Sequence, residues 1–200
     1  MKMTTGGFDI IRKKFGTLTQ EKVDNINLIV ATAEKYGLTY PQTAYVLATV
    51  AWETGRTFKA IAEYGKGKER KYGTLYTNSK GQKYGIAGSD GRTYLYSEYP
   101  HLYYGRGHTQ NTWLDNYKYI KQRTGVDVVN NPDLLLDDKL SIEVTVLALK
   151  EGWYTGKKLS DYINNTKKDY VGARRCVNGT DKAREIADYA VVFEKALRSY

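Results

Sequence analysis

Two glutamates, Glu53 and Glu63, are the residues of this sequence whose type and spacing most suggest catalysis. Glu53 directly follows an almost unbroken apolar run at residues 44–52, and Gly55 comes two positions later. We therefore expect Glu53 in the last turn of a helix that is buried nearly all round. Apolar surroundings and the negative end of the helix dipole both favour a protonated carboxyl group, which a general acid requires.

The distance between the two glutamates decides what they could do together. One straight helix from Glu53 to Glu63 would separate them by about 15 Å along its axis, but a break at Gly55 lets the chain fold back. Two carboxyl groups roughly 6.5–9.5 Å apart are what an inverting glycosidase uses. The alternative is a core glutamate bonded to backbone and an unrelated surface glutamate, so the choice depends on the rest of the sequence.

Composition and charge indicate a soluble globular protein with a polyanionic partner. The chain has 200 residues, of which 41% are hydrophobic and 26% charged, and its formal net charge is +9. Such a charge favours nucleic acid, an anionic membrane surface or an anionic wall polymer, or it merely keeps the protein soluble. The sequence also has 19 tyrosines, whose flat apolar face and polar tip suit sugars and bases.

Several function classes are disfavoured by what the sequence contains. Cys176 is the single cysteine, so no intramolecular disulfide can form, and its apolar flanks predict a small buried hydrophobe. A cysteine nucleophile or a tetrahedral zinc site would depend on His101 and His108, the two histidines of the chain. The sequence has no phosphate-binding loop and no dinucleotide fingerprint. We expect no metal and no cofactor.

Hydrophobic periodicity predicts a mainly α protein with a small β lobe. A helix at residues 19–36 precedes the Glu53 helix, which Thr39, Tyr40 and Pro41 cap and start. Further helices are expected at residues 111–123, 137–153, 159–164, 169–177 and 180–198, with Thr180 as the last N-cap. Residues 65–107 are rich in Gly and Tyr and predict one or two hairpins. They form either a cleft wall or an exposed insertion of a single catalytic domain spanning residues 1–200.

Four motifs in this order resemble a known family. They are Glu53-Thr54-Gly55, YYGRGHTQNTW at 103–113, NNPDLLLDD at 130–138 and VGARRCVNGT at 171–180. They are similar to the chitinase-like glycoside hydrolases of family 19, and especially to their bacteriophage endolysin branch. The resemblance covers roughly residues 40–195. It implies a lysozyme-like, two-lobed helical fold and cleavage of β-1,4 bonds between aminosugars with inversion, which the phage members apply to peptidoglycan.

The resemblance also assigns roles to individual residues. Glu53 resembles the general acid, Glu63 the carboxylate that polarises a water, and Thr112 the residue that holds this water. Positions similar to those that bind the sugars or order the site are Thr54, Tyr104, Gln110, Asn116 and Asn178. Arg106 is expected to be structural, bonding a nearby carboxylate or backbone carbonyl.

The sequence departs from the family pattern in two places. The family places its second carboxylate farther from the first, so the alternatives to Glu63 are Glu69, Asp90 and Glu98. His108-Thr109 and Asn111 replace more apolar residues on either side of Gln110, which changes the expected floor of the cleft.

These observations together predict a peptidoglycan-degrading phage endolysin. We expect a monomer that binds peptidoglycan glycan strands and an anionic cell envelope, without nucleic acid and without stable membrane insertion. No apolar run at the N-terminus is long enough for a signal peptide, so we expect synthesis in the host cytoplasm and release to the wall through a holin. The alternatives are a chitinase and a non-catalytic wall-binding module. A nucleic-acid-binding protein would explain the charge but not a glutamate at the end of the most apolar helix.

Overall fold

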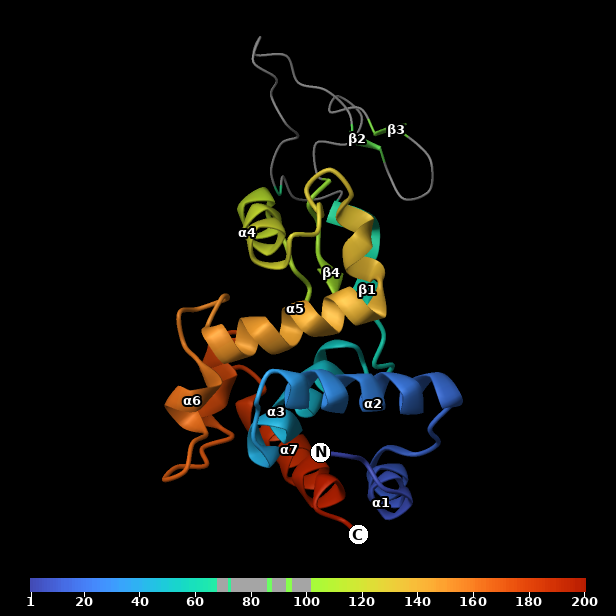
Figure 1. Cartoon of the computed structure of the whole chain (residues 1–200), viewed down its shortest axis with the longest axis vertical. Coiled ribbons are helices and arrows are strands. Elements are labelled where there is room, and N and C mark those ends of the chain that lie inside the picture. The colour runs from blue at the N-terminus through green and yellow to red at the C-terminus, as the bar shows by residue number, and fades with distance from the viewer. Residues whose placement is uncertain (68–71, 73–85, 88–92, 95–101) are drawn as a thin grey trace. The chain divides into compact units, whose positions relative to one another are not determined.

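The computed structural model describes residues 1–67, 72, 86–87, 93–94 and 102–200 (Figure 1). Contacts divide the chain into two compact units. The first unit combines Met1–Lys59 with Ile142–Tyr200, and the second unit is Ala60–Ser141, inserted between those two segments. A single catalytic domain over residues 1–200 stays a prediction.

The described residues are mostly helical, as Figure 1 shows. The α-helices are α1 (Thr5–Phe15), α2 (Gln20–Lys35), α3 (Tyr40–Glu53), α4 (Leu114–Thr124), α5 (Asp138–Glu151), α6 (Leu159–Tyr162) and α7 (Ala183–Leu197). Short 3₁₀ helices are η1 (Tyr64–Gly67), η2 (Pro132–Leu136) and η3 (Gly172–Cys176). The strands are β1 (Ile61–Ala62), β2 (Ile86–Ala87), β3 (Thr93–Tyr94) and β4 (Arg106–Gly107).

Helix α3 confirms the prediction for the stretch that carries Glu53. Thr39 is its N-cap and forms a capping box with Gln42, and Pro41 lies in the first turn. These features satisfy amide groups that the first turn leaves without partners. Every residue from 43 to 51 is buried, so the helix is covered on all sides. It ends at Glu53, and Gly55 follows with φ of +57°.

The first unit surrounds α3 with other helices. α3 packs against α2 and α7, and α1 packs against α7 (Figure 1). Ile26 and Ile29 of α2 and Ile186 and Phe193 of α7 are completely buried in the same core as α3. Burying one such side chain contributes roughly 1.5–3 kcal/mol relative to leaving it exposed. The core of the first unit is therefore built around the helix that ends in Glu53.

The second unit is organised by two short antiparallel strand pairs and a buried arginine. β1 pairs with β4, with Ile61 opposite Gly107, and β2 pairs with β3. The β2–β3 pair confirms a hairpin within residues 65–107. Most other residues of this region lie outside the described residues.

Arg106 is 1% exposed and confirms the prediction that it is structural. Its Nε donates to Asp133 Oδ1 at 2.7 Å, and its Nη1 donates to Leu102 O at 2.7 Å and Tyr117 Oη at 3.0 Å. The guanidinium lies 3.6 Å from the centre of the Tyr104 ring. A buried charge is tolerated only when its partners compensate for lost hydration, and this network provides them.

The predicted helix boundaries agree with the structure to within a few residues, with two differences. The short helical piece expected at 169–177 is the 3₁₀ helix η3 at residues 172–176. The expectation that Thr180 caps the last helix is wrong. A tight turn in which Ala183 N donates to Thr180 O at 3.2 Å moves the N-cap to Lys182, which has φ of +59°. Helix α1 was not predicted, although Thr4 caps it with its side chain.

No helix among the described residues is long and apolar enough to cross a membrane.

Cys176 gives a first prediction, because the structure confirms that it is a buried core residue. It is 0% exposed, and burial raises the pKa of its thiol from 9.0 to about 12. Between these values the unfolded chain loses the thiol proton and the folded chain keeps it, so this group lowers stability as pH rises above 9. Cys176→Ser should keep activity and cost about 1–2 kcal/mol of unfolding free energy.

Urea unfolding at pH 7 and pH 10 tests this, with Cys176→Ala as the control that adds no hydroxyl group. The Cys176 thiol of the wild type should not react with a disulfide reagent while the protein is folded. It should react once the protein has been unfolded. A folded but inactive Cys176→Ser variant would instead identify Cys176 as a nucleophile.

Candidate active site

Glu63 is held in place by both its backbone and its side chain. It directly follows β1, and the pairing of β1 with β4 brings it beside Gly105. Glu63 N donates to Gly105 O at 2.7 Å, while Gly105 N donates to Glu63 Oε2 at 2.9 Å. Tyr72 Oη donates to Glu63 Oε1 at 2.7 Å. Each carboxylate oxygen therefore accepts one hydrogen bond, which fixes the plane of the group.

Gly105 allows three of the predicted site residues to come together. A Cβ atom at this position would lie 2.7 Å from Gln110 Oε1, 3.3 Å from Glu63 Oε2 and 3.3 Å from Thr112 Cγ2. Glu63, Gln110 and Thr112 thus converge on one glycine. Gln110 is fixed further by bonds from Nε2 to Ile61 O at 2.9 Å and to the carbonyl of β4, and its backbone has φ of +53°.

The remaining predicted residues of the second unit lie close in sequence to this cluster. Asn116 is exposed on α4, and its Nδ2 donates to Thr112 O at 2.7 Å. Tyr104 is 9% exposed, and its ring lies against the Arg106 guanidinium. Tyr104 is thus part of the buried arginine network, and its contact with substrate stays a prediction.

Glu53 lies in the first unit and is paired with a residue that sequence analysis did not single out. Arg174 Nη1 donates to Glu53 Oε1 at 2.7 Å, and the Glu53 side chain is 23% exposed. Arg174 is buried on η3 and is itself held by a bond from Nε to Asp181 O at 3.0 Å. Within the described residues, no hydrogen bond to Glu53 Oε2 is formed. Among the described residues, the carboxyl group is thus anchored through Oε1.

The pairing of Glu53 with Arg174 is a feature that local sequence cannot show. The Arg174 guanidinium lies at hydrogen-bonding distance from the Glu53 carboxyl group and makes a charge-assisted hydrogen bond to it. The ARRC segment did carry a signal, since a buried arginine requires a partner, but the sequence does not say which carboxylate it meets.

Two other predicted residues of the first unit follow the members of this pair in the chain, Thr54 directly after Glu53 and Asn178 four residues after Arg174. Thr54 is 4% exposed, and its hydroxyl donates to Val50 O at 2.7 Å and accepts from Phe58 N at 3.0 Å. It therefore anchors the turn after α3. Asn178 is exposed, and its backbone N donates to Arg174 O at 3.0 Å. Contacts of Thr54 and Asn178 with sugar stay predictions.

Part of the alternatives to these residues lies in the described chain. Glu69, Asp90, Glu98 and His101 lie outside the described residues. His108 is completely buried, with Nδ1 2.7 Å from Ser141 Oγ. The described residues contain no group of three or more His, Cys, Asp or Glu side chains that could hold a metal ion.

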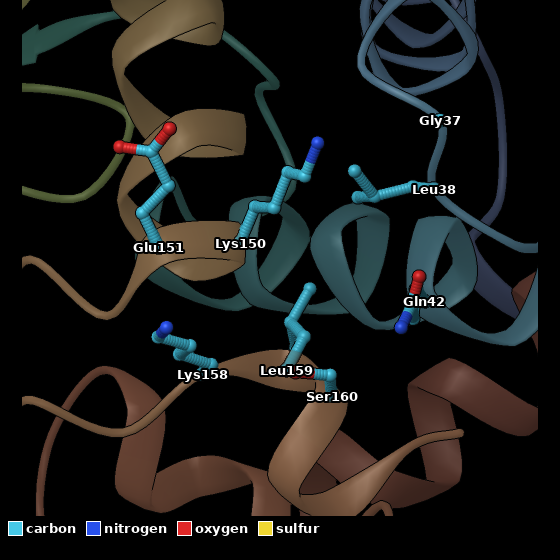
Figure 2. A pocket seen from close by; sticks show the side chains of 8 residues that line it. All are labelled: Gly37, Leu38, Gln42, Lys150, Glu151, Lys158, Leu159 and Ser160. Carbon is cyan, nitrogen blue, oxygen red and sulfur yellow. The ribbon is translucent and has the colours of Figure 1, made fainter.

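A pocket of about 390 Å³ lies elsewhere in the first unit (Figure 2). Figure 2 shows it between the start of α3, the end of α5 and the start of α6. Its lining residues do not include Glu53. Lys150 Nζ donates to Tyr36 O at 2.7 Å and Gln42 Nε2 to Ile163 O at 2.9 Å. These polar groups support the fold, and the pocket is not a candidate for the reaction.

Comparison with solved structures supports the predicted fold. Chitinase C from Streptomyces griseus matches with a TM-score of 0.54 and 19% identity, over 98% of this chain and 70% of that one. A chitinase C variant matches with a TM-score of 0.61 and 18% identity, over 100% of this chain and 93% of that one. Comparison with curated protein sequences finds no match.

The fold is therefore the mainly α, lysozyme-like fold of a glycoside hydrolase. The sequence model of glycoside hydrolase family 19, described as chitinase class I, matches residues 42–160, which is more than half of the chain. The protein belongs to this family and is a glycosidase. The matched stretch contains Glu53, Glu63, Gln110 and Thr112, while Asn178 lies beyond it.

The close approach at Gly105 gives a second prediction. Gly105→Ala places a methyl group against Gln110 and beside Glu63 and Thr112, so these side chains must move by several tenths of an ångström. A displacement of up to 1 Å at a reacting group can cost about 10²-fold in rate. We expect glycosidase activity to fall by about that factor while the circular dichroism spectrum is unchanged. The control is Gly179→Ala, where a Cβ meets no atom of the described residues within 4 Å. Full activity of Gly105→Ala would remove this cluster from the reaction.

Proposed function

We propose that the protein is a phage endolysin that hydrolyses β-1,4 bonds between the aminosugars of peptidoglycan, with inversion at the anomeric carbon. The observation that carries this proposal is the convergence of Glu63, Thr112 and Gln110 on Gly105. A carboxylate held near the side chains of a threonine and a glutamine is suited to orienting a water molecule. Membership of family 19 supplies the reaction class, hydrolysis of a glycosidic bond.

In this proposal Glu63 is the general base. An ionised carboxylate offers about four lone pairs to hydrogen-bond donors. Tyr72 and Gly105 use two of them, which leaves capacity for the attacking water. Thr112 has a hydroxyl that holds the same water, and Gln110 and Asn116 bind the sugar. The rigid support matters because a base acts only within hydrogen-bonding reach of the proton that it removes.

Glu53 is the general acid in this mechanism. Its Oε2 donates the proton to the leaving oxygen, while Oε1 stays bonded to Arg174. When the proton leaves, the Arg174 guanidinium stabilises the new carboxylate. Inversion requires the acid and the base to act on opposite faces of the sugar ring, with a water between the base and the anomeric carbon.

The net charge favours peptidoglycan as the polymer. A formal charge of +9 attracts an enzyme to an anionic cell envelope and raises its encounter rate at low ionic strength. Chitin is uncharged, so a positively charged protein surface does not raise the rate of encounter with it. We propose accordingly that the protein acts on the wall in the periplasm of its host, as a monomer, after release through a holin.

Chitin is the second candidate substrate. It is favoured by the similar solved structures, which are chitinases by name. The same pair of carboxyl groups would act on either polymer, because both contain β-1,4-linked aminosugars.

The substrate gives the third prediction. Incubation with purified sacculi should release new reducing ends without free peptide amines, at a higher rate than incubation with colloidal chitin. Proton NMR of the first product should show the α-anomer, since inversion of a β bond creates it. Peptide amines without reducing ends would identify an amidase or peptidase, and faster hydrolysis of chitin would identify a chitinase. A β-anomer would exclude inversion.

The fourth prediction concerns the two carboxyl groups. Glu53→Gln keeps the volume and the Arg174 contact but removes the proton donor, so activity should fall by at least about 10²-fold. Glu63→Gln should lower activity as strongly. Added azide should partly restore the activity of this variant, because azide replaces the activated water. The matched control is Glu185→Gln, an exposed residue of α7 whose side chain is 49% accessible. Near-normal activity of Glu53→Gln would overturn the mechanism. Near-normal activity of Glu63→Gln alone would assign the base to another carboxylate.

A further inference from the structure

His108 is a buried titratable residue that the proposed mechanism does not use. It directly follows β4 and is completely buried. Its backbone N donates to Ser141 Oγ at 2.8 Å, and its Nδ1 lies 2.7 Å from the same oxygen. Its Nε2 faces Asp138 Oδ1 at 3.5 Å. The imidazole thus has a polar partner at each nitrogen, and both partners lie at the start of α5.

The hydrogen bonds of Ser141 assign the ring hydrogen of this histidine. Ser141 Oγ accepts from His108 N, so the hydroxyl group donates its own hydrogen to Nδ1. The ring hydrogen is then on Nε2, which faces the Asp138 carboxylate. A neutral imidazole in this tautomer has a partner for both nitrogens, as a buried polar group requires.

Asp138 extends this network to the strand that leads to Glu63. Its Oδ1 also accepts from Ala60 N at 2.7 Å, and Ala60 is the residue before β1. Ile61 lies opposite Gly107 in the pairing of β1 with β4, so Ala60 and His108 are the next pair beyond this end. The same carboxylate oxygen therefore joins the two chain segments where the strand pair stops.

Glu63 and Gly105 form the opposite end of the same strand pair. Glu63 N donates to Gly105 O, and Gly105 N donates to Glu63 Oε2. Each strand has two residues, and so short a pair is marginal by itself. A slip of one residue would turn the Glu63 side chain to the other face. The register therefore depends on contacts from outside the strands, of which Gln110 provides one with its bonds to both of them.

We propose that His108 is a positioning residue for the base of the reaction. With Asp138 and Ser141 it anchors the end of the β1–β4 pair at Ala60, and the register set there keeps Glu63 opposite Gly105. His108 is completely buried, so it acts through the strands and not on the substrate. This inference rests on the proposed function for the role of Glu63, whereas the register is measured without substrate.

The test compares variants that keep one partner of the imidazole or neither. His108→Leu removes both ring nitrogens, and His108→Gln keeps an amide group that can reach Asp138. Ser141→Ala removes the hydroxyl group that fixes the ring. The control is Tyr103→Phe, which removes another buried hydrogen bond of the second unit, from Tyr103 Oη to Val129 O.

Amide hydrogen exchange, followed by NMR, measures the register directly. Glu63 N and Gly105 N both donate across the strand pair, so their exchange reports its opening. We expect both amides to exchange at least about tenfold faster in His108→Leu, less so in Ser141→Ala, and almost as in wild type in His108→Gln. Tyr103→Phe should leave them unchanged. If His108→Leu does not fold, the comparison of Ser141→Ala with the control decides. Unchanged exchange in Ser141→Ala and in any folded His108→Leu, or equal acceleration in Tyr103→Phe, would overturn the inference.

Kinetics show whether this effect reaches the reaction through Glu63. His108→Leu should lower kcat by about 10- to 10²-fold, and His108→Gln should recover most of the loss. In the Glu63→Gln protein supplied with azide, His108→Leu should change the rate by less than about threefold, because the group that it positions is absent. An equal loss in both backgrounds would make His108 a purely structural residue. If Glu63→Gln alone keeps near-normal activity, the proposed base is wrong and the positioning role fails with it, while hydrogen exchange still decides whether His108 sets the register.

Discussion

The burial of α3 on all sides is the constraint on which the first unit depends. A helix without a polar face has to be enclosed, and α2 and α7 together with the segments after α5 provide the enclosure. The C-terminal end of the helix is partly exposed and carries an ionisable side chain. Glu53 occupies that end. The demand for burial thus fixes the backbone that holds the proposed acid, and Thr54 secures the turn that follows.

In the second unit, the buried Arg106 guanidinium organises the structure, as the apolar helix α3 does in the first unit. The Arg106 guanidinium is surrounded by a carboxylate, backbone carbonyls and two tyrosines. Removing any partner would leave a buried charge partly uncompensated, so these groups constrain one another. Arg106 directly follows Gly105 in the chain. The network therefore fixes the strand that presents Gly105 to Glu63, and the rigidity of the predicted base originates in a residue that takes no part in the reaction.

The two glutamates are supported in different ways that match different tasks. Glu63 accepts two hydrogen bonds from neutral donors, one to each oxygen. Glu53 accepts one hydrogen bond from a charged donor at a single oxygen. A base needs its carboxylate oriented toward a water, while an acid needs a free oxygen for its proton and a counter-charge for the anion that remains. Pairs of carboxyl groups in unlike surroundings are a recurring feature of acid–base catalysis.

The sequence by itself determined helices α2, α3 and α7 of the first unit, the place of Glu53 at the end of the most apolar one, and the structural role of Arg106. These features follow from local pattern, because a run of apolar residues and a cap specify a helix wherever the rest of the chain lies. Only the tertiary structure decided that Arg174, 121 residues away in the chain, meets Glu53, and that Gly105, 42 residues away, meets Glu63. The sequence requires a buried polar group to have a partner but does not choose it. That choice depends on how the elements pack, which the positions of all the other side chains decide together.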